Sequence, residues 1–398
     1  MSFPELIIIP PKKIAKENGH CYIINLPELE DVACSVSNPE SPYQLFEGDQ
    51  GLQPVNALHE LIRNVGNGAH SHWCGSLLFS SSDNSDPRMN GREYSLRNTG
   101  ISAEPVNYRQ QRVSHEDLDG DVEYALSVGL GYWDLVKEAG ITSLKGKTLM
   151  EIGPGINFGS AAILACLGAD LIYVTDRFLS KWNPGYHPAF YHLLKDKMQA
   201  CTESFDLTPL DQILKTGGYK SSRIAPIETQ LEQLDGIPDD TIDIIFSNAV
   251  FEHLVDPVTA FRQLNRASRV GGLGFHQVDF RDHKDFDRPL EFLLFNDKDF
   301  KRLFNRCCGE CGNRTRPKEM VKIAQECGFT VLNYSTNMYT ENEYLEEFMP
   351  RLRKSRSRYT DWDKNDLSSI SGRLYLKKKN ALKPEHKSFL GKIKRLFG

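Results

Sequence analysis

The 398-residue sequence lacks any apolar run close to the roughly 20 residues that cross a bilayer. Its first ten residues lack the basic start and the long apolar stretch of a secretory signal. No internal repeat is evident, so solenoid and propeller architectures are not indicated. We therefore expect a cytoplasmic globular protein, longer than one ordinary domain.

An excess of charge of one sign is also missing. The sequence has 48 Lys and Arg residues against 53 Asp and Glu residues, for a formal net charge of -5. Proteins that bind nucleic acids usually carry a strongly basic domain. We therefore expect no nucleic-acid partner.

Cysteine is present without the pattern of a disulfide framework. The nine cysteines are odd in number and scattered from Cys21 to Cys327, whereas frameworks use even numbers at close spacing. We expect mostly reduced thiols. Cys307, Cys308 and Cys311, with Cys327, could supply four thiolates to zinc. Because two of these are adjacent and no pair of Cys-x-x-Cys knuckles is present, we favour a loop insertion there.

The most informative segment is 147–159, KTLMEIGPGINFG, which is typical of a buried strand, a glycine turn and a helix. Gly153 and Gly155 permit unusual dihedrals and a close approach of ligand to backbone. The helix that follows directs its free N–H groups at the turn. Glu151 suits an ammonium group and would repel a pyrophosphate. The spacing Gly-x-Gly-x-x-x-Gly, ending at Gly159, also departs from the dinucleotide pattern.

Further strands follow in an order typical of an open α/β sheet. Asp170–Asp176 is an apolar strand that ends in a carboxylate, roughly 20 residues after the glycines, where an acid accepts ribose hydroxyls. Ile237–Asn248 predicts a turn and a buried strand, and Ala249–Asp256 opens a helix. A fifth strand is expected after the break at Gly271-Gly272.

These segments resemble the class I S-adenosylmethionine-dependent methyltransferases, over about residues 110–380. The resemblance implies an α/β fold, with a Rossmann-like sheet covered by helices on both faces, and S-adenosyl-L-methionine as the cofactor. It places Glu151, with the two turn glycines, at the amino-acid end of the cofactor and Asp176 at the ribose. It implies a contact with the adenine for Glu228 and a cofactor contact for Asn248. The alternatives are that Asp176 only terminates a strand and that Glu228 is a solvated side chain.

Composition divides the chain into three parts. Residues 1–105 alternate short β-prone runs with turn residues and predict a small strand-rich module. Residues 106–380 form the predicted methyltransferase domain. In 381–398 basic residues alternate with apolar ones near helical spacing, and 383–398 could contact an anionic membrane surface or remain solvated.

The first of these parts has a polar segment at 71–94. The module is similar to one in bacterial proteins tied to surface polysaccharides. We expect either contact with a glycan or an ordinary polar loop. The β-prone runs are His20–Leu26, Tyr43–Glu47 and His72–Phe79, and one helical stretch is expected at Val55–Val65.

Ionisable side chains gather where the fourth and fifth strands end. Methyl transfer to an alcohol requires loss of the hydroxyl proton, and an imidazole is the natural base near neutral pH. We hypothesise that His253 or His276 is this base, with His283 a further candidate. Three residues of the same segment would bind a polyhydroxy acceptor, namely Asp279, Arg281 and Asp282.

A second interpretation of this segment gathers Asp279, Asp282 and His283 around a divalent cation that acidifies the acceptor. We favour metal-free base catalysis, and the metal remains an alternative. In a third interpretation these side chains have only structural roles.

The leading hypothesis is an O-methyltransferase that acts on a sugar hydroxyl of a surface polysaccharide or its precursor. Methylation of a small metabolite or a lipid is the second hypothesis, favoured if the insertion at 178–218 forms an apolar lid. The third is a non-catalytic glycan-binding or scaffold protein that retains the cofactor fold.

Overall fold

The computed structural model describes residues 4–33, 41–57, 59–99, 118–177, 179–219, 221, 223–306 and 311–379. The expected membrane-binding segment 383–398 and the pair Cys307-Cys308 lie outside these residues. The chain divides into two compact units, one built on Met1–Val113 and the other on Ser114–Gly398 apart from Asn305–Cys308. No helix in the described part of the chain is long and apolar enough to span a bilayer.

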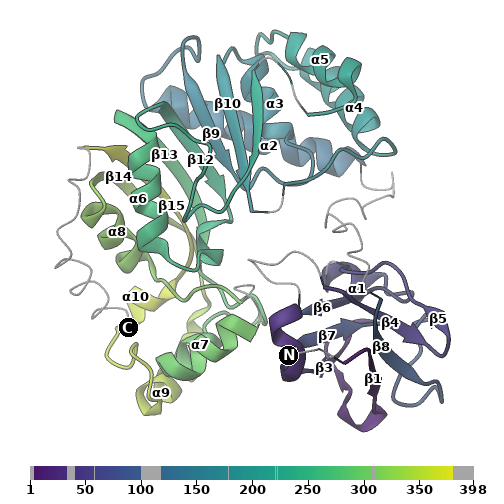
Figure 1. The fold of residues 1–398 in the computed structure, drawn as a ribbon. Helices are drawn as coiled ribbons and strands as arrows, with labels where there is room; N and C mark the ends of the chain where they lie inside the picture. The colour runs from purple at the N-terminus through teal and green to yellow at the C-terminus, as the bar shows by residue number, and fades with distance from the viewer. Residues whose placement is uncertain are drawn as a thin grey trace. The chain divides into compact units, whose positions relative to one another are not determined.

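The smaller unit consists of two four-stranded antiparallel sheets (Figure 1). Its core is formed by side chains from both sheets, among them the fully buried Leu45, Leu77 and Leu96. This confirms the expected strand-rich module. The first sheet has the order β1 (Leu6–Ile9), β8 (Tyr94–Asn98), β4 (Tyr43–Glu47), β5 (Gln50–Gly51), and the second β2 (Ala15–Lys16), β3 (Tyr22–Asn25), β7 (Ser76–Phe79), β6 (His70–Trp73). Short helical segments are η1 (Pro11–Lys13), η2 (Pro27–Val32) and α1 (His59–Asn64).

One run that the sequence predicts as a single strand of this unit forms a hairpin. The run His72–Phe79 divides into the end of β6 and all of β7, joined by a turn at Cys74 and Gly75. Both turn residues have positive φ, which a continuous strand does not allow. Cys74 is disulfide-bonded, and five other described cysteines form no disulfide: Cys21, Cys166, Cys201, Cys311 and Cys327.

The larger unit contains a seven-stranded mixed sheet in which six strands are mutually parallel and β15 is antiparallel to both of its neighbours (Figure 1). This order confirms the expected Rossmann-like sheet. The strands in spatial order are β11 (Ile224–Glu228), β10 (Leu171–Asp176), β9 (Thr148–Ile152), β12 (Ile242–Asn248), β13 (Ser268–Asp279), β15 (Ser369–Lys378) and β14 (Phe329–Tyr339).

Helices cover both faces of this sheet. Successive strand residues point to opposite faces, so Leu149 packs with one group of helices and Met150 with the other. The first group is α2 (Leu118–Glu138), α3 (Gly159–Cys166), α4 (His187–Gln199) and α5 (Thr208–Thr216), and the second is α6 (Pro257–Ala267) and α8 (Pro317–Glu326). The remaining helical segments are η4 (Phe251–His253), η5 (Glu291–Leu294), α7 (Asp297–Arg306), α9 (Asn342–Lys354) and α10 (Lys364–Ser368).

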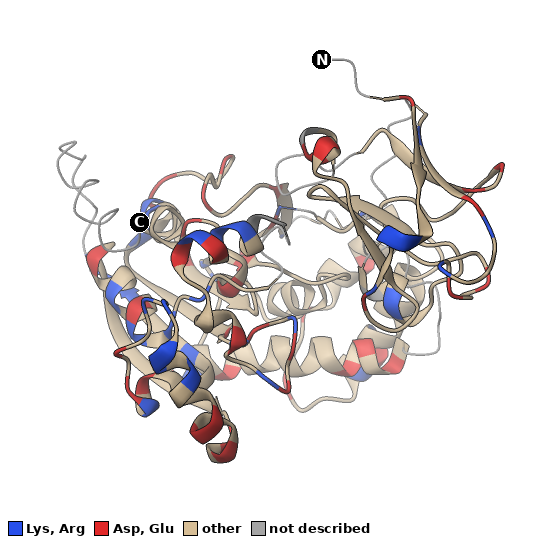
Figure 2. Ribbon diagram, turned by 90° about the horizontal axis from the view of Figure 1, so that it is seen from below, with Lys and Arg blue, Asp and Glu red and all other residues tan. Residues whose placement is uncertain are grey.

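Acidic and basic residues are interspersed along the helices of this unit (Figure 2). Some of them join neighbouring helices. Lys197 of α4 forms ion pairs with Asp119 and Glu123 of α2. Such exposed pairs contribute little stability individually, so the position of α2 depends mainly on its buried face.

The fifth strand of the sheet begins earlier than the sequence suggests. The expectation that it starts after Gly271-Gly272 is wrong, because β13 already pairs with β12 at Ser268. The glycines lie within the strand at a register irregularity, where Gly271 has a φ of +82°. A Cβ at Gly272 would lie 2.8 Å from the carbonyl oxygen of Arg269. The glycines therefore accommodate a bulge in the strand.

The helix expected from Ala249–Asp256 is also interrupted. A single 3-10 turn, η4, precedes α6, which begins at Pro257 with Asp256 as its N-cap. The Asp256 carboxylate accepts a hydrogen bond from the Thr259 N–H, and proline suits the first helical position.

Arg316 connects three segments of the larger unit from a fully buried position. Its guanidinium donates hydrogen bonds to the carbonyl oxygens of Phe280, Leu367 and Ser369. Phe280 directly follows β13, Leu367 belongs to α10, and Ser369 is the first residue of β15. One side chain therefore holds the ends of two neighbouring strands together.

We expect Arg316→Met to lower the free energy of unfolding by about 3 to 5 kcal/mol, because three buried carbonyls lose their donor. Denaturant unfolding of the full chain measures this. The control is Arg302→Met on α7, whose side chain is 71% exposed and which should change stability by no more than about 0.5 kcal/mol. Equal losses in the two variants would contradict the role of Arg316.

Candidate functional site

Several sequence-predicted residues lie together at the carboxyl ends of the parallel strands. Asp176 ends β10 and Glu228 ends β11, and the two are register partners in the sheet. Partial burial raises the pKa of Glu228, and the neighbouring Asp176 carboxylate raises it further. Asn248 ends β12, and its amide donates to the Tyr124 hydroxyl of α2 at 3.0 Å. Ligands of open α/β sheets bind at this edge.

Glu151 is the fourth residue of β9 and is 2% exposed. One carboxylate oxygen, Oε1, accepts a hydrogen bond from the Ser160 hydroxyl in the first turn of α3. The other oxygen, Oε2, is buried without a protein partner. Burial raises the pKa of Glu151 to about 7. A buried carboxylate oxygen with no donor is a favourable position for a cationic group of a ligand.

The glycine turn after β9 has the backbone that the sequence predicts. Gly153 and Gly155 have φ of +68° and +76°, which side chains rarely adopt. A Cβ at Gly153 would lie 2.5 Å from Cγ2 of Val250, in the loop after β12. A Cβ at Gly155 would meet nothing within 4 Å. Gly153 therefore allows two loops to touch, and Gly155 leaves space beside the turn.

Helix α2 covers this region of the sheet. The Tyr132 ring stacks on Phe246 of β12, with centroids 4.4 Å apart. Tyr124, in contrast, is 64% exposed and reaches the end of β12 through its contact with Asn248. Tyr132 therefore packs on the sheet, whereas Tyr124 lies at the sheet edge.

These features fit S-adenosyl-L-methionine. The orphaned Glu151 oxygen suits its ammonium group, the space beside Gly155 allows a close approach, and Asp176 can accept hydrogen bonds from the ribose hydroxyls. Glu228 and Asn248 lie at the same edge for the remaining contacts.

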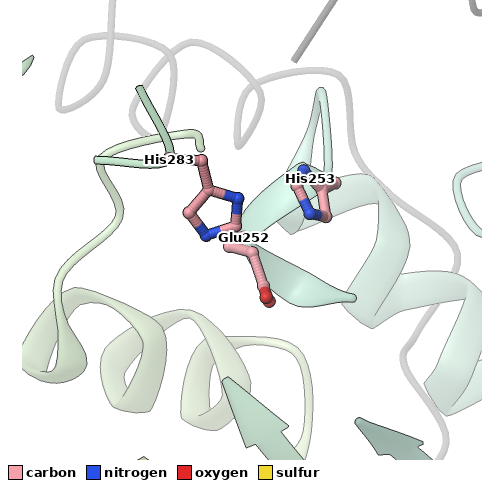
Figure 3. A group of neighbouring side chains, drawn as sticks. All are labelled: Glu252, His253 and His283. Carbon is pink, nitrogen blue, oxygen red and sulfur yellow. The ribbon is translucent and has the colours of Figure 1, made fainter. Parts of the chain in front are cut away.

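A second cluster consists of Glu252, His253 and His283 (Figure 3). Glu252 and His253 belong to η4, which follows β12, and His283 lies in the loop after β13. One ligand atom from each side chain lies within 4.8 Å of the others. The two imidazole rings meet edge to face with centroids 4.9 Å apart. The sequence predicts both histidines as site residues, whereas Glu252 has no role in that prediction.

The Glu252 side chain is 3% exposed, and neither carboxylate oxygen has a protein hydrogen-bond partner. Burial raises its pKa to about 8, and the nearby Asp279 carboxylate adds to this shift. The position of η4 is fixed by Asn313, whose backbone N–H donates to the Glu252 carbonyl at 2.7 Å. The Asn313 amide also donates to the carbonyls of Phe251 and Leu254. The loop that contains Asn313 therefore holds this orphaned carboxylate in place.

His276, a leading base candidate, is 2% exposed inside β13. Its Nδ1 lies 2.8 Å from the Ser247 hydroxyl, and its ring stacks on Phe251 at 4.4 Å. Burial lowers its pKa to about 3. An imidazole that resists protonation in this way is unsuited to accept a proton from an acceptor, so its surroundings favour a packing role.

The proposed acceptor residues are engaged with one another or with backbone. The Asp279 carboxylate accepts two parallel hydrogen bonds from the Arg281 guanidinium, the shorter at 2.6 Å. Asp282 is 5% exposed, and its carboxylate accepts from the Lys284 N–H. Within the described part of the chain, the group of three or more potential metal ligands is Glu252, His253 and His283. The alternative cation set of Asp279, Asp282 and His283 is not brought together.

A family described as a methyltransferase domain matches residues 196–275. No curated protein matches the sequence. Among solved structures, phosphoethanolamine N-methyltransferase 2 from Haemonchus contortus, in complex with S-adenosyl-L-methionine, is 14% identical, with 85% of this chain and 71% of that chain covered and a TM-score of 0.37.

Two further solved structures have similar scores. An S-adenosylmethionine-dependent methyltransferase from Mesorhizobium loti is 12% identical, with coverages of 65% and 99% and a TM-score of 0.35. An arsenic(III) S-adenosylmethionine methyltransferase from Chlamydomonas reinhardtii is 14% identical, with coverages of 60% and 65% and a TM-score of 0.34. The larger unit thus has a class I methyltransferase fold, on the basis of its strand order and the matched family. The cofactor of this fold is S-adenosyl-L-methionine.

The raised pKa of Glu151 predicts a pH-dependent stability of the cofactor-free protein. The folded state keeps the Glu151 proton up to about pH 7, above the ordinary value of 4.5. Its contribution to the free energy of unfolding is therefore fully present below pH 4.5 and is lost as the pH rises through 7. A rise in the pKa of Glu151 from 4.5 to about 7 corresponds to about 3 kcal/mol in the free energy of unfolding.

Denaturant unfolding at about pH 5 and about pH 8 tests this dependence. Glu151→Gln should remove the part of the decline in unfolding free energy between these two pH values that Glu151 causes, because glutamine does not titrate. Glu346→Gln, whose wild-type side chain is 75% exposed on α9, should keep the wild-type slope. The same slope in both variants would contradict the assignment to Glu151.

Proposed function

We propose that this protein transfers a methyl group from S-adenosyl-L-methionine to a hydroxyl oxygen, and that the acceptor is a sugar hydroxyl of a surface polysaccharide or its precursor. The observation that carries the proposal is the position of the Glu252, His253 and His283 cluster. The cluster lies just beyond the carboxyl ends of the strands, at the same sheet edge as the cofactor residues. Val250, two residues before Glu252, packs against the glycine turn.

The chemistry requires a group that receives or acidifies the hydroxyl proton. The cofactor supplies an electrophilic methyl group on a sulfonium, which becomes a neutral thioether when its carbon–sulfur bond breaks. The acceptor oxygen supplies the electron pair of the new carbon–oxygen bond. We assign the loss of its proton to the cluster, with His253 as the leading group, because an imidazole accepts protons near neutral pH.

The surroundings of the cluster favour a polar, ring-shaped acceptor. Phe286 is 53% exposed, and its ring contacts both His283 and the Arg281 guanidinium. Next to it, the Asp279–Arg281 pair offers both hydrogen-bond acceptors and donors. An aromatic surface beside such a pair suits a sugar, which has an apolar ring face and hydroxyls at its rim.

The segment 178–218 does not favour the lipid alternative. Leu194 of α4 and Leu210 and Ile213 of α5 are fully buried in the core shared with α3. This segment therefore completes the helical layer of the sheet. The contact of the smaller unit with a glycan remains a proposal that rests on its polar segment at 71–94.

We expect methyl transfer from labelled cofactor to sugar acceptors within a panel of glycans, lipids and small metabolites. His253→Ala should reduce turnover about 10²- to 10⁴-fold while cofactor affinity is retained, as for loss of a group that handles the proton. His192→Ala removes an exposed histidine of α4 and should have normal turnover. Labelling of a lipid or an amine in place of any sugar would refute the sugar hydroxyl, and normal turnover of His253→Ala would refute its role.

A further inference from the structure

We propose that Glu252, His253 and His283 bind one divalent transition-metal cation, with Zn²⁺ the ion expected. The three side chains come from two loops that the sheet brings together, and one ligand atom of each lies within 4.8 Å of the others (Figure 3). The binding of the cation is independent of the proposed function. Its catalytic role, described below, rests on that function.

Glu252 gives the main reason to expect a cation. A carboxylate that is 3% exposed and has no hydrogen-bond partner on either oxygen is costly to bury. Buried carboxylates in proteins are normally paired with a cation or bound to a metal. The Arg281 guanidinium also interacts with Glu252, but that group is already held by the Asp279 carboxylate. A bound dication would neutralise the carboxylate and occupy its lone pairs.

The ligand set distinguishes between metals. Two imidazole nitrogens and one carboxylate oxygen suit Zn²⁺ and other first-row transition ions, whereas Mg²⁺ and Ca²⁺ prefer oxygen ligands alone. Zinc bonds to nitrogen and oxygen ligands are about 2.0 to 2.2 Å long, so ligand atoms on one ion lie closer together than 4.8 Å. Both histidines are partly buried. Three protein ligands leave a position open for substrate.

Neighbouring groups support the site. Asn313 fixes the backbone of η4 with three hydrogen bonds, so the main-chain positions of Glu252 and His253 are defined. The backbone N–H of His283 donates to the Cys311 carbonyl at 3.4 Å. The Asp279 carboxylate lies 3.7 Å from Nε2 of His283 and is itself held by Arg281. A carboxylate beside a ligating histidine is a common support in metal sites, because it orients the ring.

The cation would change how the acceptor loses its proton. An acceptor hydroxyl bound at the open position would become more acidic, as water does on zinc. Its proton passes to solvent water, and the oxygen keeps the electron pair that forms the bond to the methyl carbon. When the cation is bound, His253 would promote this loss as one of its ligands, in place of accepting the proton directly.

Metal binding by the full-length protein tests the proposal directly. After removal of metals with a chelator, calorimetric titration with Zn²⁺ should show one equivalent bound, and Mg²⁺ should bind far more weakly. Glu252→Gln and His283→Ala should each weaken Zn²⁺ binding about 10- to 100-fold or more. Substitution with Co²⁺ should give a spectrum of nitrogen and oxygen ligation without thiolate charge-transfer bands.

His192→Ala is the matched control, because it removes an exposed histidine of the same unit that lies outside the cluster. It should bind Zn²⁺ as the wild type does. Circular dichroism and cofactor affinity should show that at least one cluster variant remains folded. The Zn²⁺ titration of that folded variant decides the test. Absence of stoichiometric binding, unchanged binding in a folded cluster variant, or thiolate bands with Co²⁺ would overturn the proposal. Methyl transfer that persists in the chelated enzyme would refute the catalytic role of the cation and leave the proposed methyltransferase function intact.

Discussion

Two buried carboxylates, Glu151 and Glu252, constrain the functional edge of this protein. Each has at least one oxygen that is buried without a hydrogen-bond partner, and each is 3% exposed or less. Removal of a carboxylate from water is unfavourable unless hydrogen bonds or a cation compensate. Burial accordingly raises both pKa values, to about 7 and about 8. We propose that ligands compensate both groups, an ammonium group at Glu151 and a metal cation at Glu252.

The sheet brings the two carboxylates to one edge, and a direct contact joins their loops. Glu151 lies near the end of β9, and Glu252 follows β12, the neighbouring parallel strand. Between them, Val250 occupies the position that a side chain at Gly153 would need. Val250 is the N-cap of η4, so a displacement of η4 would alter its contact with the glycine turn. This contact offers a physical route by which an occupied acceptor site could influence cofactor affinity.

The local parts of this site could be predicted from sequence, because strand, turn and helix signals lie within about 15 residues of each other. Glu151, Gly153 and Asp176 belong to such segments. The Glu252, His253 and His283 cluster could not be predicted, since it depends on how a 3-10 turn and a loop 30 residues later approach each other. The bulge at Gly271-Gly272 misled the prediction of the strand start for a related reason: glycine signals a break, and only pairing with β12 shows that the strand continues.

The contrast between His276 and His283 shows how strand register decides which side chain can react. They are seven residues apart, but His276 lies within β13 while His283 lies beyond its end. The first packs on Phe251 and loses its basicity through burial, whereas the second meets His253 at the sheet edge. Where β13 ends is set in part by Arg316, which binds the Phe280 carbonyl just after the last strand residue. The same buried guanidinium that stabilises the larger unit therefore also binds the chain where it leaves the sheet, three residues before His283.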